Sequence, residues 1–128
     1  GGRGRYGRRF ESGPGGLWIT AVVPATPPAS QWTGFSLVVG LHLLRMLERL
    51  GVVGARLRWP NDLMVNDRKL AGLLIEQGGH ETLSVGLGLN ITNEPWKEDP
   101  ALSGVACSLS QFLSPTPATE EMAQHVLD

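Results

Sequence analysis

The sequence predicts an α/β fold of the α+β type, with a largely antiparallel or mixed sheet and flanking helices. Short apolar runs bounded by glycine, proline and asparagine predict the strands. A long run with apolar residues at helical spacing predicts the first helix. Two turn signals, Asn66-Asp67 and Gly78-Gly79, predict that consecutive strands are joined as hairpins.

The first part of the chain is predicted to form a loop, a strand and a helix. Residues 1–16 are rich in glycine and arginine and predict the loop. The apolar run 17–23 predicts a buried strand, which the following prolines end. Ser30 or Thr33 can cap a helix that runs to about Leu50.

This predicted helix is amphipathic, with Gly40 on its apolar side and His42 on its polar side. Glycine is unfavourable inside a helix relative to alanine, so we expect Gly40 to pack closely on a neighbouring element. We expect His42 to be a solvated surface residue and not a ligand.

The second part of the chain is predicted to hold four strands, a mixed segment and a last helix. The strands are expected at residues 56–59, 63–65, 68–76 and 82–91. Residues 93–115 contain three prolines and predict one short helical turn near Ser108. Thr119 is the expected N-cap of the last helix. No C-cap follows this helix, so residues 1–128 are interpreted as a partial domain.

The composition argues against a nucleic-acid-binding surface over the whole chain. The chain has 128 residues, of which 41% are hydrophobic, and its net charge is −1. These values suit one globular domain, or a large part of one, without a general basic field. Four arginines nevertheless crowd the first ten residues without an acid, namely Arg3, Arg5, Arg8 and Arg9. We expect an anionic partner for that segment alone.

Cys107 is the only cysteine, so an internal disulfide is impossible and a reducing compartment is expected. Its apolar neighbours predict a small buried side chain in place of a nucleophile. The three histidines show no metal-ligand spacing, and we predict no protein metal site. No membrane span or signal peptide is visible, so the predicted location is the cytoplasm.

The strand at residues 82–91 is predicted to have one apolar face and one nearly bare face. Its apolar face carries leucine, valine and isoleucine, whereas Ser84, Gly86, Gly88 and Asn90 share the other. Two glycines on one face indicate that a helix or a ligand approaches the backbone closely. The amide of Asn90 favours a ligand, because it can both donate and accept hydrogen bonds.

Lys69 opens the apolar run "LAGLLI", immediately after the Asn66-Asp67 turn. A lone lysine at a strand end commonly snorkels, with its stem buried and its ammonium in water. The alternative is a cation held beside an anionic ligand, because a buried ammonium needs an anionic partner. Alternating glycine and arginine near the N-terminus likewise suits an anion-binding loop or a disordered nucleic-acid-binding arm.

Three stretches occur together in the order and approximate spacing seen in biotin protein ligases: "GRGRYGR", "RWPNDLMVNDRKLAGLLIE" and "VGLGLN". The chain resembles that family from about Gly1 to Asn93, and more loosely to Leu109. The resemblance implies a class II synthetase-like catalytic domain with a mixed sheet and flanking helices. It also implies two reaction steps, in which biotin and MgATP form biotinyl-adenylate, and a lysine of a biotin carboxyl carrier protein then receives the biotinyl group.

The resemblance also implies roles for individual residues. Biotin would be bound by the loop that closes over the adenylate and by the middle motif, through Arg3, Gly4, Arg5, Lys69 and Gly72. The nucleotide would be contacted by Arg8, Asn61, Asp62 and Asn90. Lys69 and Arg5 are the implied catalytic residues. By this resemblance Lys69 would lie between the two reacting anions, and Asp62 would orient Lys69 or the metal of MgATP.

The chain departs from the family pattern at Arg58, where the family usually has lysine. It also begins after the strands that hold biotin's ring and lacks the small C-terminal β domain. Full activity of the fragment alone is therefore not expected. Two alternatives stay open: a lipoate–protein ligase-like enzyme that forms acyl-adenylates, and a non-catalytic nucleic-acid-binding module that uses the arginine segment. A homodimer also stays open.

Overall fold

The computed structural model describes residues 2–25, 34–79 and 81–128. Its centre is a five-stranded antiparallel sheet with the strand order β3-β7-β6-β5-β4. The strands are β3 (Gly16–Pro24), β4 (Ala55–Arg58), β5 (Asp62–Val65), β6 (Arg68–Gly78) and β7 (Thr82–Asn90). The predicted fold class is confirmed, and the strands overlap the predicted ranges.

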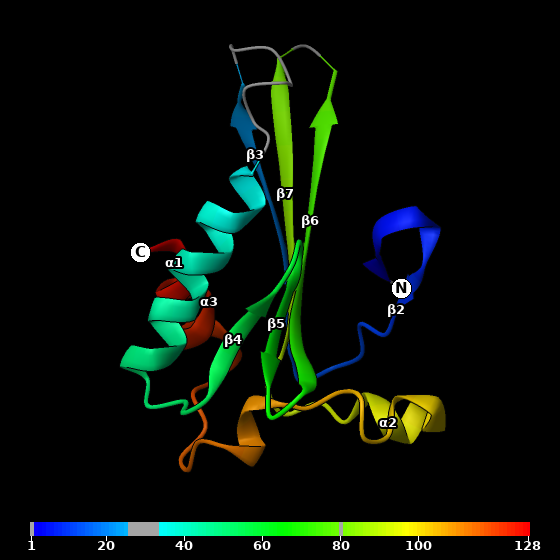
Figure 1. Ribbon diagram of the computed structural model, residues 1–128, viewed down its shortest axis with the longest axis vertical. Helices are drawn as coiled ribbons and strands as arrows, with labels where there is room; N and C mark the ends of the chain where they lie inside the picture. Colours follow the sequence, from blue (N-terminus) through cyan, green and yellow to red (C-terminus); the bar gives the residue numbers. More distant parts are fainter. Residues whose placement is uncertain (1, 26–33, 80) are drawn as a thin grey trace.

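Two helices cover one face of this sheet, as Figure 1 shows. They are α1 (Phe35–Arg49) and α3 (Thr119–Leu127), and α3 contacts both α1 and β3. The N-terminal segment lies on the opposite side of the sheet. The sheet therefore has one helix-covered face and an opposite face that the N-terminal segment approaches.

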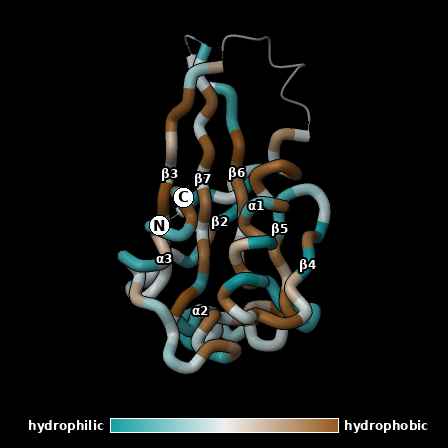
Figure 2. The backbone as a smooth tube through the Cα atoms, turned by 90° about the vertical axis from the view of Figure 1, so that its left-hand side faces the viewer, coloured by the Kyte–Doolittle hydropathy of each residue, from teal (hydrophilic) through white to brown (hydrophobic). Residues whose placement is uncertain are grey.

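The hydrophobic core lies between the sheet and the two helices. Leu43, Met46 and Leu47 of α1 are buried in one cluster with Leu87 and Leu89 of β7. Figure 2 shows hydrophobic stretches of β3, β6 and β7 separated by stretches of intermediate hydropathy. Burying this apolar surface is the main favourable contribution to folding.

The packing prediction for Gly40 is confirmed. Gly40 is buried, and a Cβ added there would lie 2.8 Å from Cδ2 of Leu57 on β4. The absence of a side chain lets α1 approach the sheet at this point. His42 is exposed, as predicted. Asn66 and Asp67 adopt positive φ angles of 49° and 61°, which confirms the hairpin turn between β5 and β6.

The predicted N-terminal loop is wrong in part, because two short strands form there. β1 (Gly2–Arg3) pairs antiparallel with β2 (Arg9–Phe10) across the 3-10 turn η1 (Arg5–Gly7). Tyr6 and Gly7 have φ angles of 59° and 71°, and these left-handed residues reverse the chain. The alternating glycine and arginine residues have no apolar periodicity that would predict these strands. We call this two-stranded segment the arginine ribbon (residues 2–10).

Three further predictions concern the helix caps and the short turns. The N-cap of α3 is Ala118, and Thr119 is its first helical residue. The short helical turn predicted near Ser108 is confirmed as η4 (Leu109–Gln111), with Ser108 as its N-cap. Residues 93–115 contain two further turns that were not predicted, α2 (Pro95–Glu98) and η3 (Pro100–Leu102). Gly34 precedes α1, whereas the proposed caps Ser30 and Thr33 lie outside the described residues. None of the described helices is long and apolar enough to cross a membrane.

Candidate active site

The face of the sheet that faces away from the helices is short of side chains. Asp62, Gly72, Gly88 and Trp18 lie opposite one another in register across β5, β6, β7 and β3. Leu74, Gly86 and Thr20 form the next row. The bare face predicted for β7 therefore continues into β6 at Gly72, and together these residues form an open floor.

A register shift places Lys69 on this floor. Asp62 pairs with Gly72 and Leu63 with Ala71, but Met64 pairs with Lys69, so Leu70 is the extra residue of a β-bulge. Strict alternation would place Lys69 on the core face with Ala71. The bulge turns Lys69 to the face of Gly72, and Leu70 is fully buried instead.

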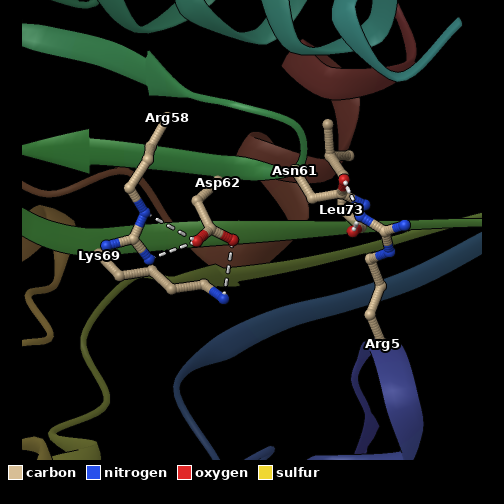
Figure 3. A network of polar contacts seen from close by, with 6 residues as sticks. All are labelled: Arg5, Arg58, Asn61, Asp62, Lys69 and Leu73. Carbon is tan, nitrogen blue, oxygen red and sulfur yellow. Dashed lines mark hydrogen bonds and ion pairs between the residues drawn. The ribbon is translucent and has the colours of Figure 1, made fainter. Parts of the chain in front are cut away.

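Lys69 forms an ion pair with Asp62 at the edge of the floor, as Figure 3 shows. Lys69 Nζ lies 2.9 Å from Asp62 Oδ1, and Arg58 Nε and Nη2 lie 3.2 and 2.5 Å from Asp62 Oδ2. Burial raises the pKa of Asp62, but the hydrogen bonds and charges of Arg58 and Lys69 outweigh it and hold that pKa below its usual value. Asp62 is therefore an ionised partner to two cations at neutral pH.

The arginine ribbon is tied to the sheet through Arg5. Arg5 Nη1 donates a hydrogen bond of 3.2 Å to Asn61 Oδ1. Asn61 Nδ2 in turn donates to the carbonyl oxygen of Leu73, and Leu73 N donates to the carbonyl of Asn61. Asn61 thus connects the ribbon to the outer edge of β6, next to Asp62 (Figure 3).

A cavity of about 550 Å³ lies between the floor and the arginine ribbon. Eight of the nine predicted site residues line it: Arg3, Gly4, Arg5, Arg8, Asn61, Asp62, Lys69 and Gly72. Its charged lining consists of five cations, Arg3, Arg5, Arg8, Arg9 and Lys69, and two carboxylates, Asp62 and Glu76. The excess of cations makes the cavity suited to anions.

Asn90, the ninth predicted residue, lines a second cavity of about 530 Å³. Lys69, Arg9 and Phe10 line both cavities, so the two adjoin at Lys69. Asn90 Nδ2 donates to the carbonyl of Cys107, and Asn90 Oδ1 accepts from Asn93 Nδ2. The fold therefore separates Asn90 from Arg8 and Asn61, the other residues assigned to the nucleotide.

Two aromatic residues that the sequence reasoning did not select also line the first cavity. The rings of Phe10 and Trp18 meet edge to face, with centroids 5.4 Å apart. A Cβ on Gly88 would lie 2.8 Å from Phe10 and 3.2 Å from Trp18, so the glycine makes room for both rings. Strand alternation in β3 places Trp18 on the same face as Gly16. This alternation was the sequence signal that could have assigned Trp18 to the cavity.

Cys107 is fully buried, and this burial raises the pKa of its thiol to about 11. The thiol is therefore protonated at neutral pH and is unsuited to nucleophilic attack. This confirms its interpretation as a small buried side chain. Among the described residues, no group of three or more His, Cys, Asp or Glu side chains could hold a metal ion.

Residues 1–90 match the model of the biotin/lipoate A/B protein ligase family. The chain belongs to this family. It is 37% identical over 95 residues to the bifunctional ligase/repressor BirA of Escherichia coli, a match that covers 70% of the chain and 30% of BirA. It is 35% identical over 104 residues to a biotin–[acetyl-CoA-carboxylase] ligase of Mycobacterium tuberculosis, covering 77% of the chain and 39% of that protein.

The fold of this family member also matches solved structures. The biotin protein ligase of Aquifex aeolicus, in complex with biotin and ATP, superposes with a TM-score of 0.82 at 28% identity. The match covers 98% of the chain and 52% of that ligase. The chain spans between 30% and 42% of the length of these and other curated relatives. The activity of a whole ligase is therefore a proposal for this chain.

Proposed function

We propose that the protein activates biotin with MgATP to biotinyl-adenylate and transfers the biotinyl group to a lysine of a carrier protein. In the first step a carboxylate oxygen of biotin forms a bond to the α-phosphorus, and the bond from that phosphorus to the bridging oxygen breaks. Pyrophosphate leaves with the electron pair. In the second step the acceptor amine attacks the acyl carbon, AMP leaves and the amine loses a proton.

The observation that carries this proposal is the position of Lys69 at the junction of the two cavities. The two reactants are both anions and repel each other. A fixed ammonium between them reduces this repulsion and stabilises the charge that develops at phosphorus. A preorganised donor of this kind contributes about 3–4 kcal/mol in enzymes from which it has been removed.

The two cavities support a division of the substrates around Lys69. The first has the glycine floor and the rings of Phe10 and Trp18, which suit the apolar part of biotin. The second holds Asn90, whose amide suits the nucleoside, and it adjoins the first at Lys69. The phosphates of the nucleotide would lie at this junction, beside Lys69, Arg8 and Asn61 of the first cavity. Magnesium would enter as part of the substrate MgATP. The arginine ribbon would cover the adenylate and protect it from water.

Relatives add independent support for biotin as the substrate. The matched proteins of Escherichia coli and Mycobacterium tuberculosis are named as biotin ligases or ligase/repressors, and the Aquifex aeolicus structure contains biotin and ATP. The carrier protein as acceptor, a homodimer and a cytoplasmic location remain predictions.

The decisive experiment is ATP–pyrophosphate exchange in the intact parent protein with biotin or lipoate as the acid. We expect exchange with biotin and little with lipoate. Exchange with lipoate alone would show that the substrate is lipoate and not biotin, since the family contains both kinds of ligase.

The nucleic-acid alternative predicts a different result, namely salt-sensitive binding to the arginine ribbon. Two of its arginines already have protein partners, because Arg5 donates to Asn61 and Arg9 pairs with Glu11 at 3.1 Å. The Arg5 contact holds the ribbon beside the first cavity, which favours the adenylating function.

A further inference from the structure

We propose that Arg58 is a positioning residue that acts on Lys69 through Asp62. It also keeps the surroundings of Lys69 positively charged. This role rests on the proposed function. Arg58 donates two hydrogen bonds to Oδ2 of Asp62, whereas Lys69 forms its ion pair with Oδ1. Each oxygen of the carboxylate therefore serves one cation. With Oδ2 held, the carboxylate keeps a fixed rotation and presents Oδ1 to the ammonium.

The charges of these three residues give the first reason for the arrangement. Asp62 and Lys69 alone would form a neutral pair, which attracts an anion weakly. Arg58 supplies a second cation, so the cluster of Arg58, Asp62 and Lys69 carries one net positive charge. Asp62 can then orient Lys69 without cancelling its attraction for a carboxylate or a phosphate.

The position of Arg58 gives the second reason. Arg58 and Asp62 face each other across the β4–β5 pair, so the backbone register holds them together. The side chain of Arg58 is 60% exposed and Arg58 lines neither cavity, whereas the side chain of Asp62 is 19% exposed. Exposed ion pairs contribute little to stability. A loss of activity on removing Arg58 would therefore reflect the positioning of Lys69 and not unfolding.

The chain offers a matched control in Arg56. Arg56 lies two residues before Arg58 on the same strand and its side chain is 62% exposed. It forms an ion pair with Asp67 at the hairpin turn and lines neither cavity. Arg56→Gln removes the same charge from the same strand, but it leaves Asp62 and its partners intact.

The first test observes the amine of Lys69 without any assay of activity. Reductive methylation with 13C-formaldehyde labels Lys69, Lys97 and the N-terminus, because the sequence has two lysines. Arg58→Gln should shift the methyl resonance of Lys69 in the 13C NMR spectrum and leave that of Lys97 unchanged. Arg56→Gln should shift neither. An unchanged Lys69 resonance in Arg58→Gln would overturn the proposal.

The second test separates positioning from substrate binding. In ATP–pyrophosphate exchange, Arg58→Gln should lower kcat by about 10- to 100-fold, as expected when a reacting group is displaced, with little change in the KM for biotin. Arg58→Lys should restore most of the rate because it restores the charge. Equal losses in Arg56→Gln and Arg58→Gln, or no rescue by lysine, would count against the role of Arg58.

The two tests fail independently of each other. A wild-type protein without exchange for biotin or lipoate would contradict the proposed function, while the NMR comparison would still decide whether Arg58 positions Lys69. A normal exchange rate in Arg58→Gln would contradict the role of Arg58 and leave the proposed function intact.

Discussion

Lys69 and Gly72 lie on the same face of the sheet, although three positions separate them on β6. A Cβ added to Gly72 would lie 3.1 Å from both Cε and Nζ of Lys69. The bulge at Leu70 makes this contact possible, because alternation in an ideal strand would direct the two residues to opposite faces. One irregularity in the backbone thus places the ammonium above the glycine floor.

Removal of the Lys69 amine should strongly slow adenylate formation while the fold persists. We expect Lys69→Ala to slow ATP–pyrophosphate exchange by about 100- to 1,000-fold, the loss seen when a preorganised donor is removed. Thermal unfolding followed by circular dichroism should remain cooperative. Lys97→Ala is the control, because Lys97 pairs with Glu94 outside both cavities. Near-normal exchange in Lys69→Ala would disprove the role given to this amine.

Filling the floor should weaken the binding of biotin. A methyl group at Gly88 would lie 2.8 Å from Phe10 Cε1, so Gly88→Ala must displace the ring into the first cavity or away from it. We expect lower biotin affinity by calorimetry and a loss of about 1–3 kcal/mol in the free energy of unfolding, as for overpacked cores. In Gly13→Ala, where no atom lies within 4 Å of the new methyl, both quantities should stay unchanged.

Loosening the arginine ribbon should release the intermediate. Arg5→Gly removes the hydrogen bond to Asn61 that ties the ribbon to the sheet. We expect biotinyl-adenylate to escape about tenfold faster, which corresponds to one hydrogen bond to a charged group, and acceptor choice to become less strict. The escape is measured by filtration of the enzyme with its radiolabelled intermediate. Unchanged retention would argue against the ribbon as a cover.

Stability in acid should depend on Asp62. The pKa of Asp62 is lower in the folded chain than its ordinary value of 3.8, so ionised Asp62 stabilises the fold above that pH. This contribution should be lost as the pH falls through the folded pKa. We expect the free energy of unfolding of Asp62→Asn to depend less steeply on pH below pH 3.8 than that of the wild type. The free energies of unfolding are measured by urea denaturation at each pH. An equal dependence on pH in Asp62→Asn and the wild type would contradict the ion-pair geometry.

The sequence by itself determined the main helices, the strands of the central sheet and the family. Apolar periodicity located α1 and the long strands, since burial of one side of each element is a local pattern that the chain must carry. The Asn66-Asp67 turn and the bare face of β7 were visible for the same reason. The motifs around Lys69 pointed to the family to which the chain belongs.

Only the tertiary structure decided how these residues meet. The bulge at Leu70 reverses the side on which Lys69 emerges, and it arises from pairing with β5, which strand periodicity does not encode. The contacts of Phe10 with Gly88 and of Arg58 with Asp62 likewise join residues of different strands. Such contacts depend on register and on packing between distant segments. The sequence therefore indicates which groups are present, and the folded sheet sets their distances and charges.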